Sequence, residues 1–287
     1  MPVAFVVGAG GAVGRFLLPR LLESGHDVVA LSRRARTSST PRLRWVVGDL
    51  NAAMPPLPPL DAIFSLGPLD AFARWFATAE LAGTPRVVAL GSTSVETKRD
   101  SVDAAERALA MRLADAERTL AAAADARGSA WTVFRPTLIY GAGVDRSLTP
   151  LARAALRWRV FPRPIGARGL RQPVHADDLA AACVAALASA RSAGRIYALG
   201  GGERLTFAAM LERVRRSLPR RALPVPLPVA AARALAHALR ALGVDVAHAA
   251  ALDRLGRDLV VDDAAARADF GWSPRAFTVD AQTWRAD

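Results

Sequence analysis

The sequence is short of the residues that form metal sites and covalent cross-links. It contains a single cysteine, Cys183, so it cannot form an intramolecular disulfide framework or a cysteine-rich metal site. Its four histidines show no ligand spacing such as HExxH, and we therefore predict no metal centre. Lysine and tyrosine are almost as scarce, with Lys98 alone and two tyrosines, which limits the acid–base chemistry that the chain can carry out.

Targeting and membrane-spanning patterns are also missing. Met1–Val7 carries no basic segment and leads directly into a strand-like stretch, and no apolar run approaches the length that crosses a bilayer. Val229–Leu242 is amphipathic, but its apolar face is short and alanine-rich, so we expect it to pack over a substrate pocket instead of a membrane. The expectation is a soluble cytoplasmic protein without membrane contact.

Positive charge is the main excess in the composition. The formal net charge is +12, and nearly all the positive charge is arginine spread along an alanine-rich chain. Because no block of consecutive basic residues is interleaved with aromatics, nucleic-acid binding is not expected. Anionic small molecules such as nucleotide phosphates fit this charge.

Short apolar segments alternate with helical segments in the first half of the chain. With 52% hydrophobic residues, the chain can build a substantial core. The alternation predicts a Rossmann-type α/β fold, with a doubly wound parallel sheet. Strands are predicted at Val3–Val7, Val28–Leu31, Leu43–Val47, Ala62–Leu66, Val87–Leu90 and Trp131–Arg135, and helices at Ala12–Ser24, Ala71–Ala82 and Ala104–Ala126.

The pattern changes from about Leu148, where arginine, proline and glycine become frequent. We predict that residues 1–160 form a dinucleotide-binding domain to which 172–200 return, and that 161–287 form mainly a smaller substrate-binding region. Residues 219–228 are predicted to be a proline-punctuated link. Further elements are predicted at Asp177–Ser189 (helix), Arg195–Leu199 (strand) and Phe207–Ser217 (helix).

A glycine-rich segment joins the first predicted strand to the first helix. Gly8, Gly11 and Gly14 have the spacing Gly-x-x-Gly-x-x-Gly in the strand–turn–helix context of a dinucleotide site. The first glycine permits a tight turn, the next lets the backbone approach a pyrophosphate, and the last lets helix and strand pack closely. The helix N-terminus then offers unpaired N–H groups to the phosphates. The predicted cofactor loop comprises Gly8, Gly10, Gly11, Ala12, Val13 and Gly14.

The end of the second strand bears on the choice of cofactor. An NAD-specific site usually has an acidic residue there, whereas this sequence has Ser32, Arg33 and Arg34. A guanidinium can pair with a 2′-phosphate, so NADP is favoured over NAD; the alternative is that both arginines are solvated surface residues. Asp49, at the edge of the third strand, could accept from the adenine amino group or could cap a turn.

Further motifs follow the glycine loop in a fixed order: Gly48–Leu50, Arg135–Gly141, Val174–Ala180, Asp258–Asp262 and Phe270–Pro274. Together they resemble the extended and atypical short-chain dehydrogenase/reductase superfamily, and more narrowly the NAD-dependent epimerase/dehydratase group that acts on nucleotide sugars. The resemblance spans essentially the whole chain and does not specify a substrate. The remaining predicted cofactor contacts, at or near strand ends, are Leu50, Leu66, Gly67 and Pro136.

The sequence departs from this superfamily at its catalytic pair. The family typically places Tyr-x-x-x-Lys on the long helix after the fifth strand, where the tyrosine is the general acid/base and the lysine lowers its pKa and holds the nicotinamide ribose. Alignment through Glu117 puts Leu109 and Leu113 at these positions. Neither tyrosine of the chain has a lysine four residues later, so the usual pair is absent.

Other polar residues are candidates for the site. Ser92 matches the family's catalytic Ser/Thr position and Ser94 is a candidate substrate contact, with turn formation as the alternative for both. Tyr140, after the sixth strand, could donate a proton or could be a buried phenol with one hydrogen bond. The resemblance implies that Arg171, and more loosely Arg254, bind a substrate diphosphate, with ion pairing as the alternative.

Two functions are compatible with these residues. The first is an NADP-dependent oxidoreductase or epimerase-like enzyme for a small anionic or nucleotide-linked substrate, with Ser92 and Tyr140 as candidate catalytic residues. The second is a regulatory or assembly protein that keeps the dinucleotide site and has lost the chemistry. The sequence favours the enzyme, and the resemblance makes a homodimer compatible with either function.

Overall fold

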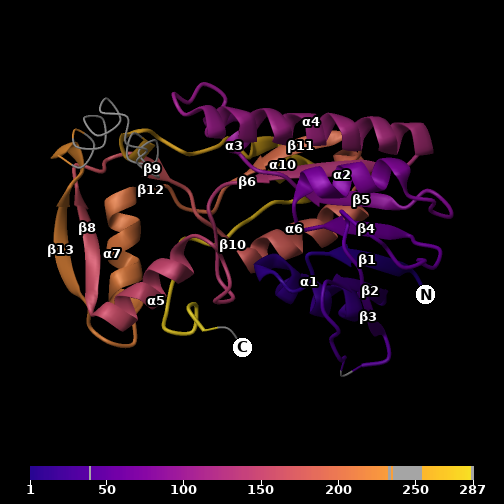
Figure 1. Cartoon of the computed structure of the whole chain (residues 1–287), viewed down its shortest axis with the longest axis horizontal. Helices are drawn as coiled ribbons and strands as arrows, with labels where there is room; N and C mark the ends of the chain where they lie inside the picture. The colour runs from indigo at the N-terminus through magenta and orange to yellow at the C-terminus, as the bar shows by residue number, and fades with distance from the viewer. Residues whose placement is uncertain (39, 232–233, 235–253, 286–287) are drawn as a thin grey trace.

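A seven-stranded parallel sheet forms the main lobe of the protein (Figure 1). The computed structural model describes residues 1–38, 40–231, 234 and 254–285. The strand order is β11-β6-β5-β4-β1-β2-β3, and every pairing in this sheet is parallel. The predicted doubly wound α/β fold is confirmed. The strands are β1 (Val3–Val7), β2 (Asp27–Ser32), β3 (Leu43–Val47), β4 (Ala62–Ser65), β5 (Arg86–Leu90), β6 (Trp131–Pro136) and β11 (Arg195–Leu199).

Helices cover both faces of this sheet because its strands are apolar on both faces. Alternate residues of one strand enter two separate cores: Val6 packs in the cluster with α1 and α6, and Phe5 packs in the cluster with α2 and α4. The helices are α1 (Ala12–Glu23), α2 (Leu69–Thr78), α4 (Ala104–Arg127) and α6 (Ala176–Ala188), and the short α3 (Ser94–Thr97) precedes α4.

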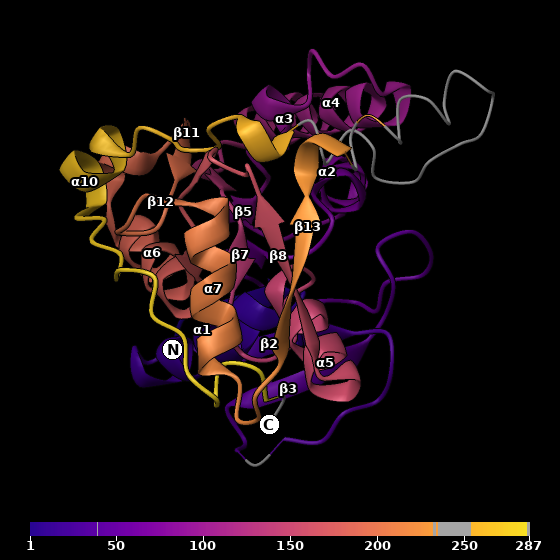
Figure 2. The ribbon, with the colours of Figure 1, turned by 90° about the vertical axis from the view of Figure 1, so that its left-hand side faces the viewer.

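A second, smaller lobe lies at the side of the sheet toward which the carboxyl ends of its strands point (Figures 1 and 2). Its own hydrophobic cluster includes Tyr140, Phe161 and Met210. The chain leaves this lobe to add β11 next to β6, and α10 (Ala264–Phe270) returns to pack near β11. The elements of this second lobe and of its connections to the sheet are β7 (Ile139–Tyr140), α5 (Leu148–Trp158), β8 (Val160–Ile165), β9 (Leu170–Arg171), β10 (Val174–His175), β12 (Leu205–Thr206), α7 (Phe207–Ser217) and β13 (Leu223–Pro228).

The predicted link at 219–228 is wrong for most of its length. Leu223–Pro228 forms β13, which pairs in parallel with β8 over six residues. Alternating prolines hide both strands from sequence reasoning, because proline cannot donate to a ladder and is found mainly at sheet edges. The helix predicted at Val229–Leu242 falls almost wholly outside the described residues. Within the described ranges, no helix combines the length and apolar character needed to cross a bilayer.

Candidate functional site

Most of the predicted site residues gather at one edge of the sheet. Because the strands are parallel, their carboxyl ends meet at the same edge, where open α/β sheets bind ligands. Gly8 follows β1, Ser32 ends β2, Leu66 follows β4, Ser92 lies just after β5, and Pro136 ends β6. The sheet order places β1 between β4 and β2, so the glycine loop lies between the residues that these two strands contribute.

The glycine loop makes close backbone contacts that a side chain would prevent. Gly8 has φ +77°, and a Cβ on it would stand 2.8 Å from the carbonyl carbon of Leu66 and 2.9 Å from the nitrogen of Gly67. The Gly11 amide donates to the Gly8 carbonyl at 2.9 Å, which closes the turn. A Cβ on Gly14 would stand 2.3 Å from the Ala9 carbonyl oxygen. The first glycine therefore permits the turn as predicted, and the last one allows α1 to pack closely on the loop that follows β1.

The amino end of α1 is left open to an anion. In this fully described helix, Gly11 occupies the N-cap position without a side-chain cap, and the first turn contains no acidic residue. The Ala12 and Val13 backbone lies in this first turn, where N–H groups lack intrahelical partners and carry partial positive charge. A pyrophosphate is the type of ligand that such an end binds.

Arg36 joins the loop, although sequence reasoning did not single it out. Its Nη2 lies 2.8 Å from the place where a Cβ would stand on Gly10, and its guanidinium stacks 5.0 Å from the ring centroid of Trp45 on β3. The guanidinium is thus held between the glycine loop and the third strand. The cluster Arg33-Arg34-x-Arg36 after β2 was the available sequence signal.

The other residues predicted to bind the adenosine part of the cofactor lie at the ends of β2 and β3. Arg33 and Arg34 are exposed, and the Ser32 hydroxyl accepts from the Arg34 amide at 3.2 Å. The Asp49 Oδ1 accepts from the Asn51 amide at 2.9 Å, which is the turn-capping alternative, and Leu50 packs against the α2/α4 cluster. The arrangement leaves the two exposed arginines beside the end of β2.

The serines after β5 form a turn beside the end of β6. The Ser92 Oγ accepts from the Ser94 amide at 3.1 Å, and the intervening Thr93 donates through its amide and hydroxyl to the Pro136 carbonyl. Ser92 and Ser94 are both half-buried, so the turn does not remove them from the site. On α4, Leu109 and Leu113 are half-buried as well.

Tyr140 lies in the hydrophobic core of the second lobe. Its side chain is 0% exposed, and its ring packs edge-on against His175 and Phe277. The Thr278 amide donates to its hydroxyl at 3.4 Å, and burial raises the pKa of the phenol to about 12. This placement fits the alternative of a buried phenol with one hydrogen bond, because a buried phenol with a raised pKa is a poor proton shuttle near neutral pH.

The two arginines expected to bind a diphosphate have protein partners. Arg171 is buried, and its guanidinium donates to the carbonyls of Leu170, Arg254 and Arg257. Desolvation lowers the pKa of Arg171. Arg254 forms an ion pair with Glu106 on α4. These contacts argue against a ready diphosphate site and favour the ion-pairing alternative for Arg254.

Glu106 also holds the sole lysine of the chain. Lys98 Nζ lies 3.5 Å from Glu106 Oε1, and the Ser101 hydroxyl donates to Oε2 at 2.8 Å. Burial alone would raise the pKa of Glu106, but hydrogen bonds from Arg254 and Ser101 and the nearby cationic charges outweigh it, so the pKa is lowered. Glu106 therefore stays ionised and ties Lys98 and Arg254 together, an arrangement with no local sequence signal because Arg254 is 148 residues away.

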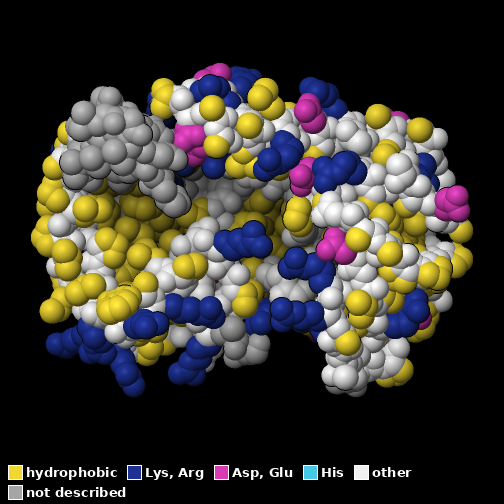
Figure 3. Space-filling model, in the orientation of Figure 1, with side chains coloured by type: hydrophobic (Ala, Val, Ile, Leu, Met, Phe, Trp, Pro, Cys, Tyr) yellow, Lys and Arg dark blue, Asp and Glu magenta, His cyan; other side chains and the backbone are white. Residues whose placement is uncertain are grey.

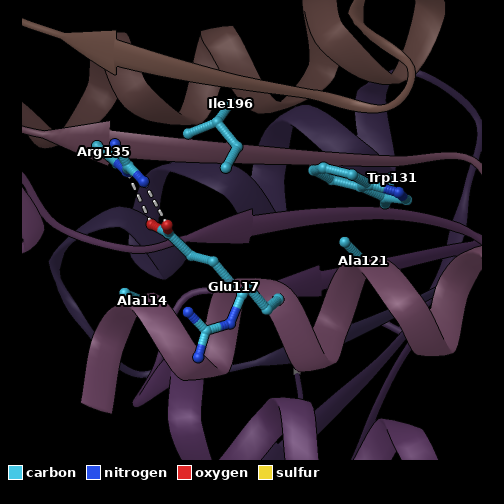
Figure 4. Close-up of a pocket in the computed structure, with 7 residues that line it drawn as sticks. Ala114, Glu117, Ala121, Trp131, Arg135 and Ile196 are labelled. Carbon is cyan, nitrogen blue, oxygen red and sulfur yellow. Dashed lines mark hydrogen bonds and ion pairs between the residues drawn. The ribbon is translucent and has the colours of Figure 1, made fainter. Parts of the chain in front are cut away.

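A pocket of about 230 Å³ lies between α4 and the far end of the sheet (Figure 4). Its polar centre is the ion pair in which Arg135 reaches from β6 to Glu117 on α4. Since β6 is three strands from β1, the pocket is about 14 Å across the sheet from the glycine loop and is a separate feature. Its lining comprises Ala114, Glu117, Arg118, Ala121, Trp131, Arg135 and Ile196.

Comparison with known proteins agrees with this geometry. A family model described as NAD(P)H-binding matches residues 8–190. The mitochondrial NADH dehydrogenase (ubiquinone) 1 alpha subcomplex subunit 9 of Arabidopsis thaliana is 28% identical over 265 residues, covering 81% of this chain and 62% of its own length. Its counterpart from Dictyostelium discoideum is 25% identical over 238 residues, with coverages of 74% and 63%. The chain therefore spans about six-tenths of the length of these curated relatives.

Solved structures share the fold at low sequence identity. The UDP-glucuronic acid 4-epimerase of Bacillus cereus, in complex with NAD, superposes with a TM-score of 0.68 at 13% identity and covers 98% of this chain and 95% of its own. An epimerase from Methanothermobacter thermautotrophicus gives a TM-score of 0.70 at 14% identity, with coverages of 98% and 90%. The resemblance seen in the sequence motifs is thus confirmed at the level of fold, and the chain belongs to the NAD(P)H-binding family.

Proposed function

We propose that the protein binds NADP(H) as a structural or regulatory ligand within a protein assembly, without the acid–base chemistry of sugar-nucleotide enzymes. The position of every tyrosine and lysine supports this proposal. Tyr140 is buried, the Tyr197 hydroxyl donates to Asp269 at 2.7 Å, and Lys98 is paired with Glu106. None of the three is placed to act as the family's acid–base pair, and Leu109 and Leu113 stand at its aligned positions.

A protein partner is supported by the names of the two curated relatives. Both are named as subunits of NADH dehydrogenase, a multi-subunit complex. Because the chain spans only about six-tenths of their length, we do not propose that it belongs to the same complex. We propose a role of the same kind, in which the protein is part of an assembly and its dinucleotide site serves stability or signalling.

Turnover measurements test the proposal directly. We expect calorimetry to show NADPH binding, and absorbance at 340 nm to show no turnover against a panel of carbonyl compounds and nucleotide sugars. Turnover by the unmodified protein would contradict the proposal. The double variant Leu109→Tyr/Leu113→Lys tests whether the missing Tyr–Lys pair is the cause of the lack of turnover. Leu109→Phe/Leu113→Met is a control of similar bulk. Activity in the first variant alone supports the proposal.

An enzyme with a different catalytic group is the second candidate function. The intact glycine loop and the half-buried Ser92 at the same edge of the sheet favour it, because a nicotinamide cofactor supplies the hydride and a hydroxyl can orient a substrate oxygen. A small anionic or nucleotide-linked substrate fits the arginine-rich surroundings. The same 340 nm panel separates this candidate from the first, since it requires turnover by the unmodified protein.

The preference for NADP over NAD follows from the arginines after β2. Arg36 is already held against Gly10, and Arg33 and Arg34 are exposed in the same segment, so three cations follow the strand end at which a 2′-phosphate is usually bound. Arg36→Ala is expected to weaken NADPH binding roughly tenfold to a hundredfold and leave NADH binding nearly unchanged, as loss of a charge-assisted bond implies. Titration calorimetry with both cofactors measures this.

The matched control is Arg118→Ala, an exposed arginine on α4 remote from β2. It removes the same charge from the protein, so it should leave both affinities unchanged if the Arg36 effect is local. An equal loss for NADPH and NADH in Arg36→Ala would show that Arg36 supports the loop and does not read the 2′-phosphate.

A further inference from the structure

Exposed hydrophobic side chains are concentrated on the two-stranded ribbon of β8 and β13. Six of the eleven exposed large hydrophobics among the described residues lie there or directly before it, with exposed fractions from 38% for Leu227 to 71% for Leu223. Scattered exposed hydrophobics are ordinary, but a contiguous group marks an interaction site. We call this group the apolar ribbon: Trp158, Val160, Ile165, Leu223, Val225 and Leu227.

Arginine is the only charged residue type in the two segments that form the apolar ribbon. Segments 157–168 and 219–228 contain six arginines and no acidic residue. All six are exposed, and none is paired with a carboxylate in the part of the chain that the structure describes. The preceding acidic residue, Glu212, is already held by Arg215 and Arg216. The six arginines are Arg157, Arg159, Arg163, Arg168, Arg220 and Arg221.

The apolar ribbon lies at one end of the long axis of the molecule, away from the sheet (Figures 1 and 2). In the space-filling view, hydrophobic side chains follow this end and Lys or Arg side chains gather below them (Figure 3). Two segments that carry arginine and no acidic residue favour approach to an anionic surface.

The backbone of the ribbon excludes one common type of partner. Proline occupies positions 162 and 164 of β8 and positions 224, 226 and 228 of β13. Because proline has no N–H, these strands cannot offer a continuous ladder to an added strand, so recognition depends on side chains. The Trp158 ring lies 5.1 Å below the Arg157 guanidinium. Tryptophan and arginine are both favoured where apolar tails meet charged headgroups.

We propose that the apolar ribbon docks on an anionic phospholipid surface, with its apolar side chains at headgroup depth and its arginines on lipid phosphates. A lipid surface fits better than an acidic protein, because the ribbon protrudes and has no carboxylate to fix one orientation by mixed charge pairing. The sequence expectation of no membrane contact rests on the lack of a membrane-spanning run and on the short apolar face of Val229–Leu242, and the apolar ribbon is a different surface. The proposal does not depend on the dinucleotide site.

Vesicle co-sedimentation of the full chain tests the proposal. The probes are vesicles of phosphatidylcholine alone and of phosphatidylcholine with about one-third phosphatidylglycerol. We expect at least about tenfold stronger partitioning to the anionic vesicles, reduced by high salt as screening requires. Leu223→Ser/Val225→Ser and Arg220→Ala/Arg221→Ala should each remove most of this binding.

Matched controls lie on other surfaces. Val102→Ser/Met111→Ser replaces two side chains that are 74% and 61% exposed, and Arg99→Ala/Arg118→Ala removes two exposed arginines. Both should bind anionic vesicles as the unmodified protein does. Unchanged thermal melting and NADPH binding establish that a ribbon variant is folded; if Leu223→Ser/Val225→Ser does not fold, the Arg220→Ala/Arg221→Ala variant decides.

Three outcomes overturn the proposal. Equal binding to neutral and anionic vesicles would show that the arginines do not contact lipid phosphates. Equal losses of vesicle binding in ribbon and control variants would show that the apolar ribbon is not the contact surface. Concentration-dependent dimers in sedimentation velocity that disappear in the ribbon variant, without vesicle binding, would show that a second copy of the chain covers this surface.

Discussion

Replacing Gly14 with alanine is expected to lower the free energy of unfolding by about 3 kcal/mol, the upper part of the range for overpacked sites. A Cβ there would stand 2.3 Å from the Ala9 carbonyl oxygen, 2.5 Å from its carbon and 2.6 Å from its Cα. All three atoms belong to the backbone of the glycine loop, so no side-chain rotation relieves the overlap and α1 must move away from that loop. Chemical denaturation followed by circular dichroism measures the loss.

Gly256→Ala is the matched control for this substitution. A Cβ on Gly256 would meet nothing within 4 Å, and the residue does not have a left-handed φ, so we expect a change within about 0.5 kcal/mol. Gly14→Ala should also weaken NADPH binding, because moving α1 displaces the N–H groups at its amino end. Unfolding of Gly14→Ala at the same denaturant concentration as the unmodified protein would show that α1 and the loop at Ala9 are not in such close contact.

The glycine loop could be predicted from the sequence because the causes of its structure are local. A buried strand, a turn that needs a left-handed residue at Gly8 and a helix that packs closely at Gly14 all lie within twelve residues. Strand β11 and helix α7 likewise have the bounds predicted for Arg195–Leu199 and Phe207–Ser217, since short apolar runs and helical periodicity reflect burial on neighbouring elements.

The parts that could not be predicted depend on contacts between distant residues. Nothing around Arg36 shows that it packs on Gly10, and nothing around Glu106 shows that it binds Arg254. The core position of Tyr140 is set by Phe277, which is far along the chain. The burial of Tyr140 bears on the functional interpretation, because a buried phenol with a raised pKa is poorly suited to replace the family's acid–base group.

Strands β8 and β13 were missed for a different reason. Their prolines break the pattern of ladder donors and β-branched residues that identifies a strand, so the segments have the composition of loops. The two-stranded ribbon tolerates these prolines because part of its backbone faces outward and needs no partner strand. The same feature leaves the apolar ribbon exposed, so one sequence property accounts both for the missed strands and for the proposed membrane surface.

Replacing Glu117 with alanine is also expected to lower the free energy of unfolding by about 3 kcal/mol, the low end of the cost of breaking a buried ion pair. Its Oε1 lies 2.9 Å from the Arg135 Nε and its Oε2 lies 2.5 Å from Nη2, and the Glu117 side chain is 4% exposed (Figure 4). Removing the carboxylate leaves the Arg135 guanidinium with Glu96 alone, near the surface. Denaturant titration measures the change.

A second variant separates the ion pair from simple loss of packing. Glu117→Leu/Arg135→Met removes both charges and keeps most of the volume, so it should be less destabilised than Glu117→Ala, because no largely buried guanidinium is left with only the exposed Glu96 as a partner. Asp115→Ala, which breaks the exposed pair with Arg118 on the same helix, should cost no more than about 0.5 kcal/mol. If all three variants lose the same stability, the pair between α4 and β6 contributes through packing and not through its charges.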